Sequence, residues 1–355
     1  MGKQIETAIV KIDPVSPEVA VLKRAVDLLR EGELVVFPTE TVYGLGADAF
    51  QPRALEGIFL AKGRPFSDPL ILHIAEYDEL AQLTSAVPAV ARQLAQAFWP
   101  GPLTLILPRG PHVPYIATAG METVAVRMPA HPVARALIKA LGSPIAAPSA
   151  NRFMHISPTT ADHALADLRG RVPLILDGGP CQVGVESTIL DLSVDVPIIL
   201  RPGGTSLESL RAVLPEVQPP ARREAQSEET AQKAPGQLPR HYAPAIPLLL
   251  FAGSEEAIRS AMLKELRLRV ERGERVGVLV ADDDLPAFQS SGAQVCSLGE
   301  AANSAQVAAN LFACLRALEE IPVQVILCRS FPTHELGLAI GDRLRRAAGS
   351  SVIQV

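Results

Sequence analysis

Several kinds of segment are scarce or absent in this sequence, and each absence excludes a class of protein. The longest apolar run, IPLLLFA, is far shorter than the roughly 18 residues of a membrane span, so we expect no membrane association. The first residues lack the basic start and apolar core of a secretory signal, and we therefore expect a cytoplasmic location. The four cysteines form no C-x-x-C pair. Their spacing predicts buried thiols rather than a disulfide framework or a thiolate zinc site.

An excess of positive charge is also missing. The formal net charge is −5, and residues 1–207 contain 17 Lys and Arg against 20 Asp and Glu. Proteins that coat nucleic acid usually have a basic surface, so this task is disfavoured, although a local basic pocket is compatible with the composition. The histidines have neither H-x-H nor H-x-x-x-H spacing. We therefore predict no metal site built by the protein, and expect any metal to arrive as Mg²⁺ on a nucleotide.

The sequence does contain the material for a large apolar core. Its 355 residues are 48% hydrophobic and 20% charged, which predicts a folded protein of about two domains. Up to about residue 207, strand patterns interleave with helix patterns, and the last strands have no helix between them. This order predicts an α/β domain with a mixed sheet. The predicted helices cover residues 17–31, 52–61, 87–98, 131–141 and 159–168, and the predicted strands lie at 34–37, 69–74, 103–107, 123–129, 144–151, 172–179, 187–193 and 197–203.

A proline-rich stretch separates this region from the rest of the chain. It has almost no apolar periodicity and predicts a linker over residues 208–244. Beyond it, three apolar strands alternate with helices predicted over residues 254–268, 303–319 and 334–347. This alternation is typical of a small parallel, Rossmann-like sheet. Because no glycine fingerprint follows its first strand, we expect residues 245–355 to form an accessory domain rather than a second nucleotide site.

Lys62-Gly63-Arg64 is the first motif that suggests chemistry. Two cations separated by one glycine, with Pro65 enforcing a turn, can hold polyphosphate oxygens. The alternative is a solvated basic cap at the end of the helix predicted over 52–61, because cations complement the helix dipole at that end. The motif alone does not decide between them.

Several predicted strands end or begin at polar residues. Ser149 and Asn151 follow an apolar segment at the edge where α/β sheets bind ligands, although a Ser or Asx turn explains them as well. Arg127 ends an alternating strand, and a buried guanidinium must pair with an acid or with an anionic ligand. Ser187 begins a later strand, and Arg201 precedes two glycines. We predict that these strand ends converge on one cleft.

The stretch TETVYGLGADA contains a possible nucleotide motif. Gly44 to Ala49 fits the G-x-G-x-x-[GA] pattern of dinucleotide-binding proteins. However, the glycines do not follow the preceding strand directly, and no acidic strand end comes about 20 residues later. We therefore interpret the glycines as a turn that lets the backbone pass close beneath a small ligand.

Seven motifs in order closely resemble the YrdC-like family: FPTETVYGLGADA, AKGRP, FWPGPLTLIL, VAVRMPAHP, APSAN, GVESTILDL and ILRPGG. RHYAP and the terminal α/β region resemble its two-domain form, so the resemblance covers essentially the whole chain. It implies a YrdC-like domain (1–207) with a twisted mixed sheet and a concave ligand cleft, a linker (208–244) that folds back over the active site, and a smaller Rossmann-like accessory domain (245–355).

The resemblance also implies an activity. The enzyme would be a nucleotidyltransferase that converts L-threonine, bicarbonate and ATP to L-threonylcarbamoyladenylate, pyrophosphate and water. This is the first step towards the t6A modification of tRNA. Mg²⁺ would come with ATP, and the product would pass to the t6A transferase machinery, with at most weak contact to tRNA.

Individual residues match functional positions of the family. The catalytic tetrad at the ATP phosphates is matched by Lys62, Arg64, Ser149 and Asn151. ATP-binding positions are matched by Arg64, Asp68, Thr123, Ser149, Ser157, Arg201 and Tyr242. Threonine-binding positions are matched by Thr41, His73, Arg127, Ala147 and Ser187, with Arg127 taking the substrate carboxylate.

The sequence departs from the family pattern in two places. Asp68 stands where we expect Asn, and the bulky Phe153 and Met154 replace small residues. Two other functions stay open. A carbamoyl-adenylate-forming YrdC-like protein normally adds acylphosphatase and Cys-rich segments that this chain lacks, and a double-stranded RNA-binding module would need more positive charge.

Overall fold

The computed structural model describes residues 5–221, 232–236 and 243–355. The chain forms two compact units. The first comprises Met1–Phe153 and Ser157–Leu238, and the second comprises Met154–Ile156 and Pro239–Val355. Within the described ranges, no helix has both the length and the apolar character needed to cross a bilayer.

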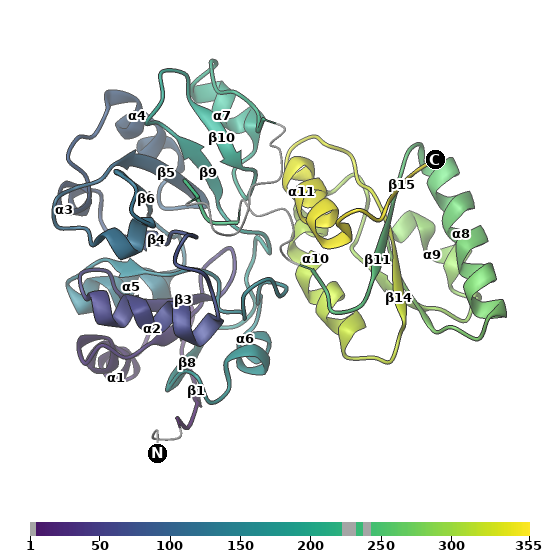
Figure 1. Ribbon diagram of the computed structural model, residues 1–355, viewed down its shortest axis with the longest axis horizontal. Coiled ribbons are helices and arrows are strands. Elements are labelled where there is room, and N and C mark those ends of the chain that lie inside the picture. The colour runs from purple at the N-terminus through teal and green to yellow at the C-terminus, as the bar shows by residue number, and fades with distance from the viewer. Residues whose placement is uncertain (1–4, 222–231, 237–242) are drawn as a thin grey trace. The chain divides into compact units, whose positions relative to one another are not determined.

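A ten-stranded sheet forms the centre of the first unit (Figure 1). Its strand order is β1-β8-β2-β3-β7-β4-β6-β5-β9-β10, and parallel pairs such as β4 and β6 adjoin antiparallel pairs such as β5 and β6. The predicted mixed sheet is therefore confirmed. The strands are β1 (Ala8–Lys11), β2 (Val35–Phe37), β3 (Gly44–Asp48), β4 (Ile71–His73), β5 (Leu103–Pro108), β6 (Thr123–Arg127), β7 (Ile145–Ala146), β8 (Leu174–Asp177), β9 (Thr188–Asp191) and β10 (Ile198–Arg201).

Helices cover the two faces of this sheet unequally. Apolar side chains of α1 and α5 pack on β2 and β8, whereas those of α2, α4 and α6 pack on the other face. The α-helices are α1 (Val19–Arg30), α2 (Pro52–Lys62), α3 (Leu80–Leu83), α4 (Ala89–Phe98), α5 (Pro132–Leu141), α6 (Ala161–Leu168) and α7 (Leu207–Val213). The five helices predicted from periodicity are confirmed, with ends that shift by one or two residues, because each has an apolar stripe to bury.

A separate small cluster lies on strands β4, β5, β6, β9 and β10. It consists of the strand residues Ile71, Ile106, Ala125, Ile189 and Leu200 together with Ala234. Among the described residues, its cover comes from the segment 232–236 rather than from a helix. This part of the sheet face is where the polar side chains of the candidate site project.

The predicted turn at Gly44 and Gly46 is wrong. Both glycines lie inside β3, which pairs antiparallel with β2, and the chain reverses before Gly44. A Cβ atom on Gly46 would stand 2.7 Å from the ring of Phe37 and 2.9 Å from Ile145. The glycines are therefore needed for close packing across the strands, a reason that the local sequence does not reveal.

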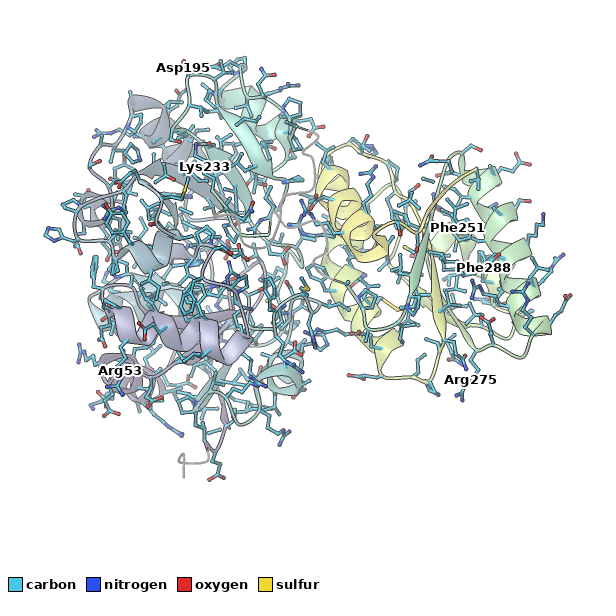
Figure 2. All side chains as sticks on the ribbon, viewed as in Figure 1. Arg53, Asp195, Lys233, Phe251, Arg275 and Phe288 are labelled. Carbon is cyan, nitrogen blue, oxygen red and sulfur yellow. A yellow bond between two sulfur atoms is a disulfide. The ribbon has the colours of Figure 1, made fainter. Side chains whose placement is uncertain are left out.

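The second unit contains a five-stranded, fully parallel sheet in the order β13-β12-β14-β11-β15, as the Rossmann-like prediction required. Phe251 and Phe288, which are labelled in Figure 2, belong to its core. Two short edge strands, β13 and β15, were not predicted. The elements are β11 (Leu248–Ala252), α8 (Glu255–Glu271), β12 (Val276–Val280), α9 (Leu285–Phe288), β13 (Gln294–Ser297), α10 (Ser304–Glu319), β14 (Val325–Arg329), α11 (Gly337–Ala348) and β15 (Val352–Gln354).

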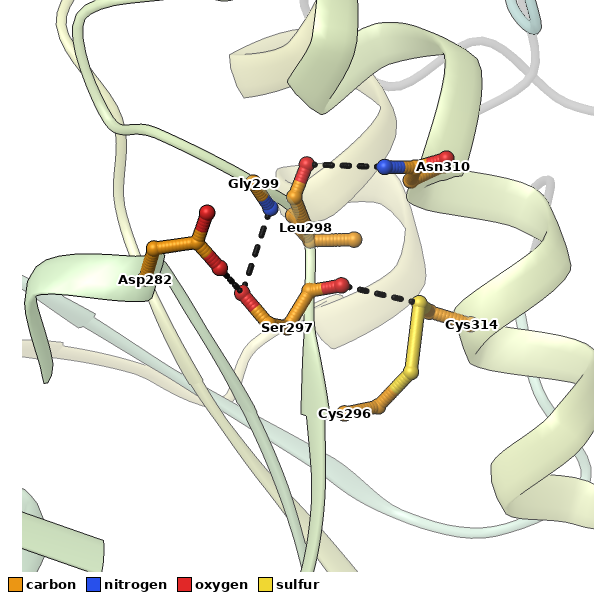
Figure 3. The surroundings of a disulfide bond; sticks show 7 residues. All are labelled: Asp282, Cys296, Ser297, Leu298, Gly299, Asn310 and Cys314. Atoms are coloured by element: carbon orange, nitrogen blue, oxygen red, sulfur yellow. Dashed lines mark hydrogen bonds between the residues drawn. A yellow bond between two sulfur atoms is a disulfide. The ribbon is translucent and has the colours of Figure 1, made fainter. Parts of the chain in front are cut away.

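The expectation of four free thiols is wrong for one pair. Cys296 on β13 and Cys314 on α10 form a disulfide, with their Cα atoms 6.0 Å apart (Figure 3). That separation lies in the usual range for a disulfide. Cys181 and Cys328 are free and buried, as predicted. The spacing of 18 residues between Cys296 and Cys314 gives no sign of pairing, because only the packing of α10 on β13 brings these two sulfurs together.

Reducing this disulfide should lower the melting temperature of the second unit by roughly 10 °C. Closing an 18-residue loop stabilises a fold by about 3 kcal/mol in the chain-entropy model, and each kcal/mol shifts the melting of a domain of about 100 residues by roughly 4 °C. Calorimetry with and without reductant measures the shift. The matched control is the double variant Cys296→Ser/Cys314→Ser, which should melt at the same temperature in both buffers.

Candidate active site

Lys62 lies at the carboxyl end of α2 and is buried, with 3% of its surface exposed. Gly63 ends the helix in the left-handed conformation. The Lys62 ammonium donates hydrogen bonds to the main-chain oxygens of Ser149 and Asn151, both at 2.5 Å, and to Asn151 Oδ1 at 3.4 Å. The alternative interpretation as a solvated helix cap is therefore wrong, and three of the four tetrad residues are in direct contact.

Arg64 is fixed against the following loop. Its Nε donates to the main-chain oxygen of Asp68 at 3.0 Å, and its Nη2 donates to that of Pro69 at 2.6 Å. The same Nη2 lies 3.0 Å from the Asp68 carboxylate, and both side chains are almost fully buried. The unexpected Asp68 is therefore an ion-pair partner of Arg64, which offsets the repulsion that a carboxylate would exert on phosphates.

Burial and neighbouring charges shift the pKa values of Lys62 and Asp68. Burial and the nearby Arg64 charge lower the pKa of Lys62, so the fold favours release of its proton. Burial also raises the pKa of Asp68, against the opposing effects of Arg64, Lys62 and Arg201. An anionic ligand here would favour the charged form of Lys62 and oppose this lowering of its pKa. The arrangement suits a polyphosphate, which brings the compensating negative charge.

A row of polar side chains crosses the centre of the sheet. His73 at the end of β4 is the register partner of Arg127 at the end of β6, and Arg127 is the partner of Thr104 on β5. Register partners project from the same face of a sheet, so these three side chains lie next to one another. All three are buried. The strand-end pattern indicated Arg127 and the family resemblance indicated His73, but neither indicated Thr104.

Arg127 has an acidic partner that sequence reasoning did not identify. Its Nη2 lies 2.6 Å from Glu40 Oε1, and Glu40 Oε2 accepts a hydrogen bond from the Ala130 main-chain nitrogen at 3.0 Å. Arg127 Nε also donates to the Gly101 oxygen at 3.3 Å. Glu40 thus neutralises the buried guanidinium and fixes its plane, and a planar, fixed guanidinium is suited to bidentate binding of a carboxylate.

His73 is neutral at physiological pH. Burial, reinforced by the Arg127 charge, lowers the pKa of His73 to about 3. Its Nδ1 lies 3.2 Å from the Ile71 oxygen, which fixes Nδ1 as the protonated nitrogen. Its role is therefore that of an uncharged hydrogen-bonding group beside Arg127.

Arg201 at the end of β10 holds the segment that begins β9. Its Nη2 donates to the Ser187 main-chain oxygen at 2.9 Å and to Ser187 Oγ at 3.1 Å. Ser187 Oγ in turn lies 2.7 Å from Thr104 Oγ1. On the preceding residue, the Glu186 carboxylate accepts a hydrogen bond from Ser157 Oγ at 2.5 Å. These contacts connect the nucleotide and threonine candidates, and Thr104 was not among the predicted residues.

The remaining predicted site residues belong to other segments than the row formed by His73, Arg127 and Thr104. Thr41 is buried in the β2–β3 connection, where its hydroxyl is 2.8 Å from that of Thr39, and Ala147 follows β7 directly. Thr123 begins β6 while Arg127 ends it, so the two are separated by roughly 13 Å along the strand. Tyr242 lies outside the described residues.

One piece of the predicted linker lies against the site. In the segment 232–236, the Gln232 main-chain nitrogen donates to the Ser67 oxygen at 2.9 Å, and Arg201 Nη1 donates to the Pro235 oxygen at 3.5 Å. Lys233, labelled in Figure 2, forms an ion pair of 2.7 Å with Asp191. The segment therefore contacts both the loop that follows Arg64 and the arginine at the end of β10.

Comparisons with known proteins define the class of this chain. Residues 27–203 match the family model described as "Telomere recombination". Residues 205–349 match the model described as "Threonylcarbamoyl-AMP synthase, C-terminal domain". The two matches follow each other along the chain, which is therefore a two-domain member of the class that joins these domains.

Relatives that match nearly the whole chain identify its family. The threonylcarbamoyl-AMP synthase of Pyrococcus abyssi is 43% identical over 334 residues, which cover 94% of this chain and 96% of the relative. That of Bacillus subtilis is 45% identical over 340 residues, or 95% of each chain. The crystal structure of Pyrococcus abyssi Sua5 complexed with L-threonine is similar, with a TM-score of 0.92, 42% identity and coverage of 98% and 99%. This chain belongs to the threonylcarbamoyl-AMP synthase family.

Proposed function

We propose that this protein is a nucleotidyltransferase that makes L-threonylcarbamoyladenylate and pyrophosphate from L-threonine, bicarbonate and MgATP. One observation carries the proposal. Arg127, held by Glu40, offers a fixed cation beside neutral His73, and the Thr104–Ser187–Arg201 contacts connect this group to a second set of buried cations. A carboxylate site thus adjoins a polyphosphate site, as a reaction between an amino acid and ATP requires.

The residues divide between the two substrates as follows. Arg127 binds the threonine carboxylate, and Thr41, His73, Ala147 and Ser187 form the rest of the threonine pocket. The ATP phosphates are held by Lys62 and Arg64 with Ser149 and Asn151, and the nucleotide also contacts Asp68, Thr123, Ser157, Arg201 and Tyr242. Support comes from the burial of the described members of this set other than Ser149 and Thr123, which are half-buried, and from the threonine complex of the similar Sua5 structure.

The chemistry consists mostly of positioning. The threonine amine attacks bicarbonate to give a carbamate and water, and a carbamate oxygen then attacks the α-phosphorus and expels pyrophosphate. Holding an unstable carbamate beside ATP requires orientation and exclusion of water. Cations at the phosphates stabilise the charge that develops on pyrophosphate. No side chain is required as a covalent nucleophile.

Magnesium enters this proposal as part of the substrate. Among the described residues, no three His, Cys, Asp or Glu side chains gather as a protein-built metal site would require. The Asp68 carboxylate, the acid nearest Arg64, already has that cation as its partner. We therefore propose that Mg²⁺ is carried by the ATP phosphates.

We also propose a cytoplasmic enzyme, composed of a catalytic domain (1–207), a closing linker (208–244) and an accessory domain (245–355), that delivers its product to the t6A transferase machinery.

The decisive test is release of pyrophosphate from ATP by the purified protein. We expect release only when threonine and bicarbonate are both present, because neither alone supplies the attacking carbamate. Coupled detection of pyrophosphate, with each substrate omitted in turn, measures this dependence. Equal rates with serine or with no amino acid would contradict the proposal, and tight RNA binding with a steep salt dependence would favour the RNA-binding alternative instead.

A further inference from the structure

Thr104 and Ser187 form a pair of buried hydroxyls at the middle of the candidate site. Neither side chain has measurable exposure, and their oxygens are 2.7 Å apart. Ser187 also accepts a hydrogen bond from Arg201 Nη2 at 3.1 Å. Thr104 lies on β5 and Ser187 directly precedes β9, 83 positions away in the sequence. We call Thr104 and Ser187 the hydroxyl pair.

Only one of the two hydrogens of the hydroxyl pair is used in the hydrogen bond between its two oxygens. Each hydroxyl carries one hydrogen and can accept two hydrogen bonds. One hydrogen lies in the bond between the two oxygens, whichever of them donates. Within the part of the chain that the structure describes, the other hydrogen has no acceptor. A buried hydroxyl hydrogen without an acceptor is unfavourable, so this hydrogen is available to donate to an oxygen of a bound ligand.

The position of the hydroxyl pair limits which ligand oxygen can accept its second hydrogen. On one side Thr104 is the register partner of Arg127, and on the other side Ser187 contacts Arg201. In the proposed function, which this inference assumes, Arg127 holds the threonine carboxylate and Arg201 contacts the nucleotide. The substrate group that must lie between them is the one that joins the amine to the α-phosphate.

We propose that the hydroxyl pair donates a hydrogen bond to an oxygen of bicarbonate, and of the carbamate formed from it, and that Thr104 is the positioning residue that orients Ser187 for this contact. The neighbouring Arg127 and Arg201 charges favour an anion at this point. The pair would thereby select the third substrate and hold its oxygen in place for the attack on ATP.

Replacing Thr104 by valine tests the proposal, because valine has the same shape but no hydroxyl. In buffer depleted of carbon dioxide, with threonine and ATP saturating, we expect the bicarbonate KM of Thr104→Val to rise about tenfold or more. This corresponds to the loss of one hydrogen bond to a charged group. The ATP KM should stay within about twofold, and the threonine KM should rise less than the bicarbonate KM, because Ser187 also borders the threonine pocket. Thr104→Ser, which keeps the hydroxyl, should restore most of the bicarbonate affinity.

A matched control removes a different buried hydroxyl. Thr84 is also buried and donates to the Leu80 main-chain oxygen at 3.0 Å, outside the site. Thr84→Val should leave all three KM values unchanged. Melting curves of each variant show whether a change reflects the loss of folded protein.

Three outcomes overturn the proposal. A rise in the threonine KM of Thr104→Val equal to that for bicarbonate would assign the donor to threonine instead. Unchanged KM values would reduce Thr104 to a packing residue, and so would equal effects of valine and serine. Failure of the proposed function is seen separately, as a lack of bicarbonate-dependent pyrophosphate release by the unsubstituted protein. In that case ¹³C NMR of labelled bicarbonate, with and without Thr104→Val, still decides whether the pair binds it.

Discussion

Arg127→Ala is expected to raise the threonine KM by about 100-fold or more while changing the ATP KM by less than about threefold. The alanine variant loses charge-assisted hydrogen bonds to the threonine carboxylate, which contribute about 1.5–3 kcal/mol each, and every 1.4 kcal/mol corresponds to roughly a factor of ten. ATP contacts other cations and should be little affected. Steady-state pyrophosphate release with one substrate varied at a time measures both constants. An equal rise in both would remove Arg127 from the carboxylate role.

The Arg127 variant needs controls for folding, because Glu40 would be left buried without a cation. Breaking a buried ion pair from one side costs about 3–5 kcal/mol of stability. The double variant Glu40→Gln/Arg127→Met removes this unpaired charge and should melt closer to the unsubstituted protein, yet it should still bind threonine poorly. Arg53→Ala removes an exposed arginine of the same unit and should change neither KM. Recovery of threonine affinity in the double variant would show that Arg127 acts only through stability.

Lys62→Met is expected to lower kcat by about 100- to 1,000-fold, the usual effect of removing one donor that stabilises charge in a transition state. Methionine matches the length of lysine but cannot donate to the Ser149 and Asn151 oxygens or neutralise the leaving pyrophosphate. Pyrophosphate release at saturating threonine, bicarbonate and ATP measures the change, and a thermal melt measures the folded fraction. Lys139→Met, on a lysine whose side chain is 74% exposed, is the matched control and should be fully active. A folded Lys62 variant with normal kcat would contradict the role of Lys62 in ATP chemistry.

Much of the fold could be predicted from local pattern. The predicted helices of the first unit and most of its strands are confirmed, because an apolar stripe with a period of 3.6 or 2 needs only neighbouring residues to be recognised. The parallel sheet of the second unit was also predicted correctly. Missed strands are either short edge strands, such as β13 and β15, or carry no apolar alternation, such as the glycine-containing β3. In β3 the strand depends on Phe37 and Ile145, which leave no room for a side chain at Gly46.

The candidate site was predictable only in part, for a related reason. Polar residues at strand ends indicated Ser149, Asn151 and Arg127, because a cation or amide in that position needs a partner, and the two cations of Lys62-Gly63-Arg64 indicated Lys62. The partners themselves lie far along the chain: Glu40 is 87 residues from Arg127, and Ser187 is 83 residues from Thr104. Local pattern carries no information about which strands will be neighbours.

The sequence by itself therefore determined the class of fold, the order of its elements and the residue types available for binding anions. Those depend on local periodicity and on the chemistry of single side chains. The tertiary structure alone decided that Arg64 is paired with Asp68, that Glu40 fixes Arg127, that Cys296 meets Cys314, and that the hydroxyls of Thr104 and Ser187 are hydrogen-bonded to each other. Each of these depends on strand order and register, which arise when distant apolar faces are buried together.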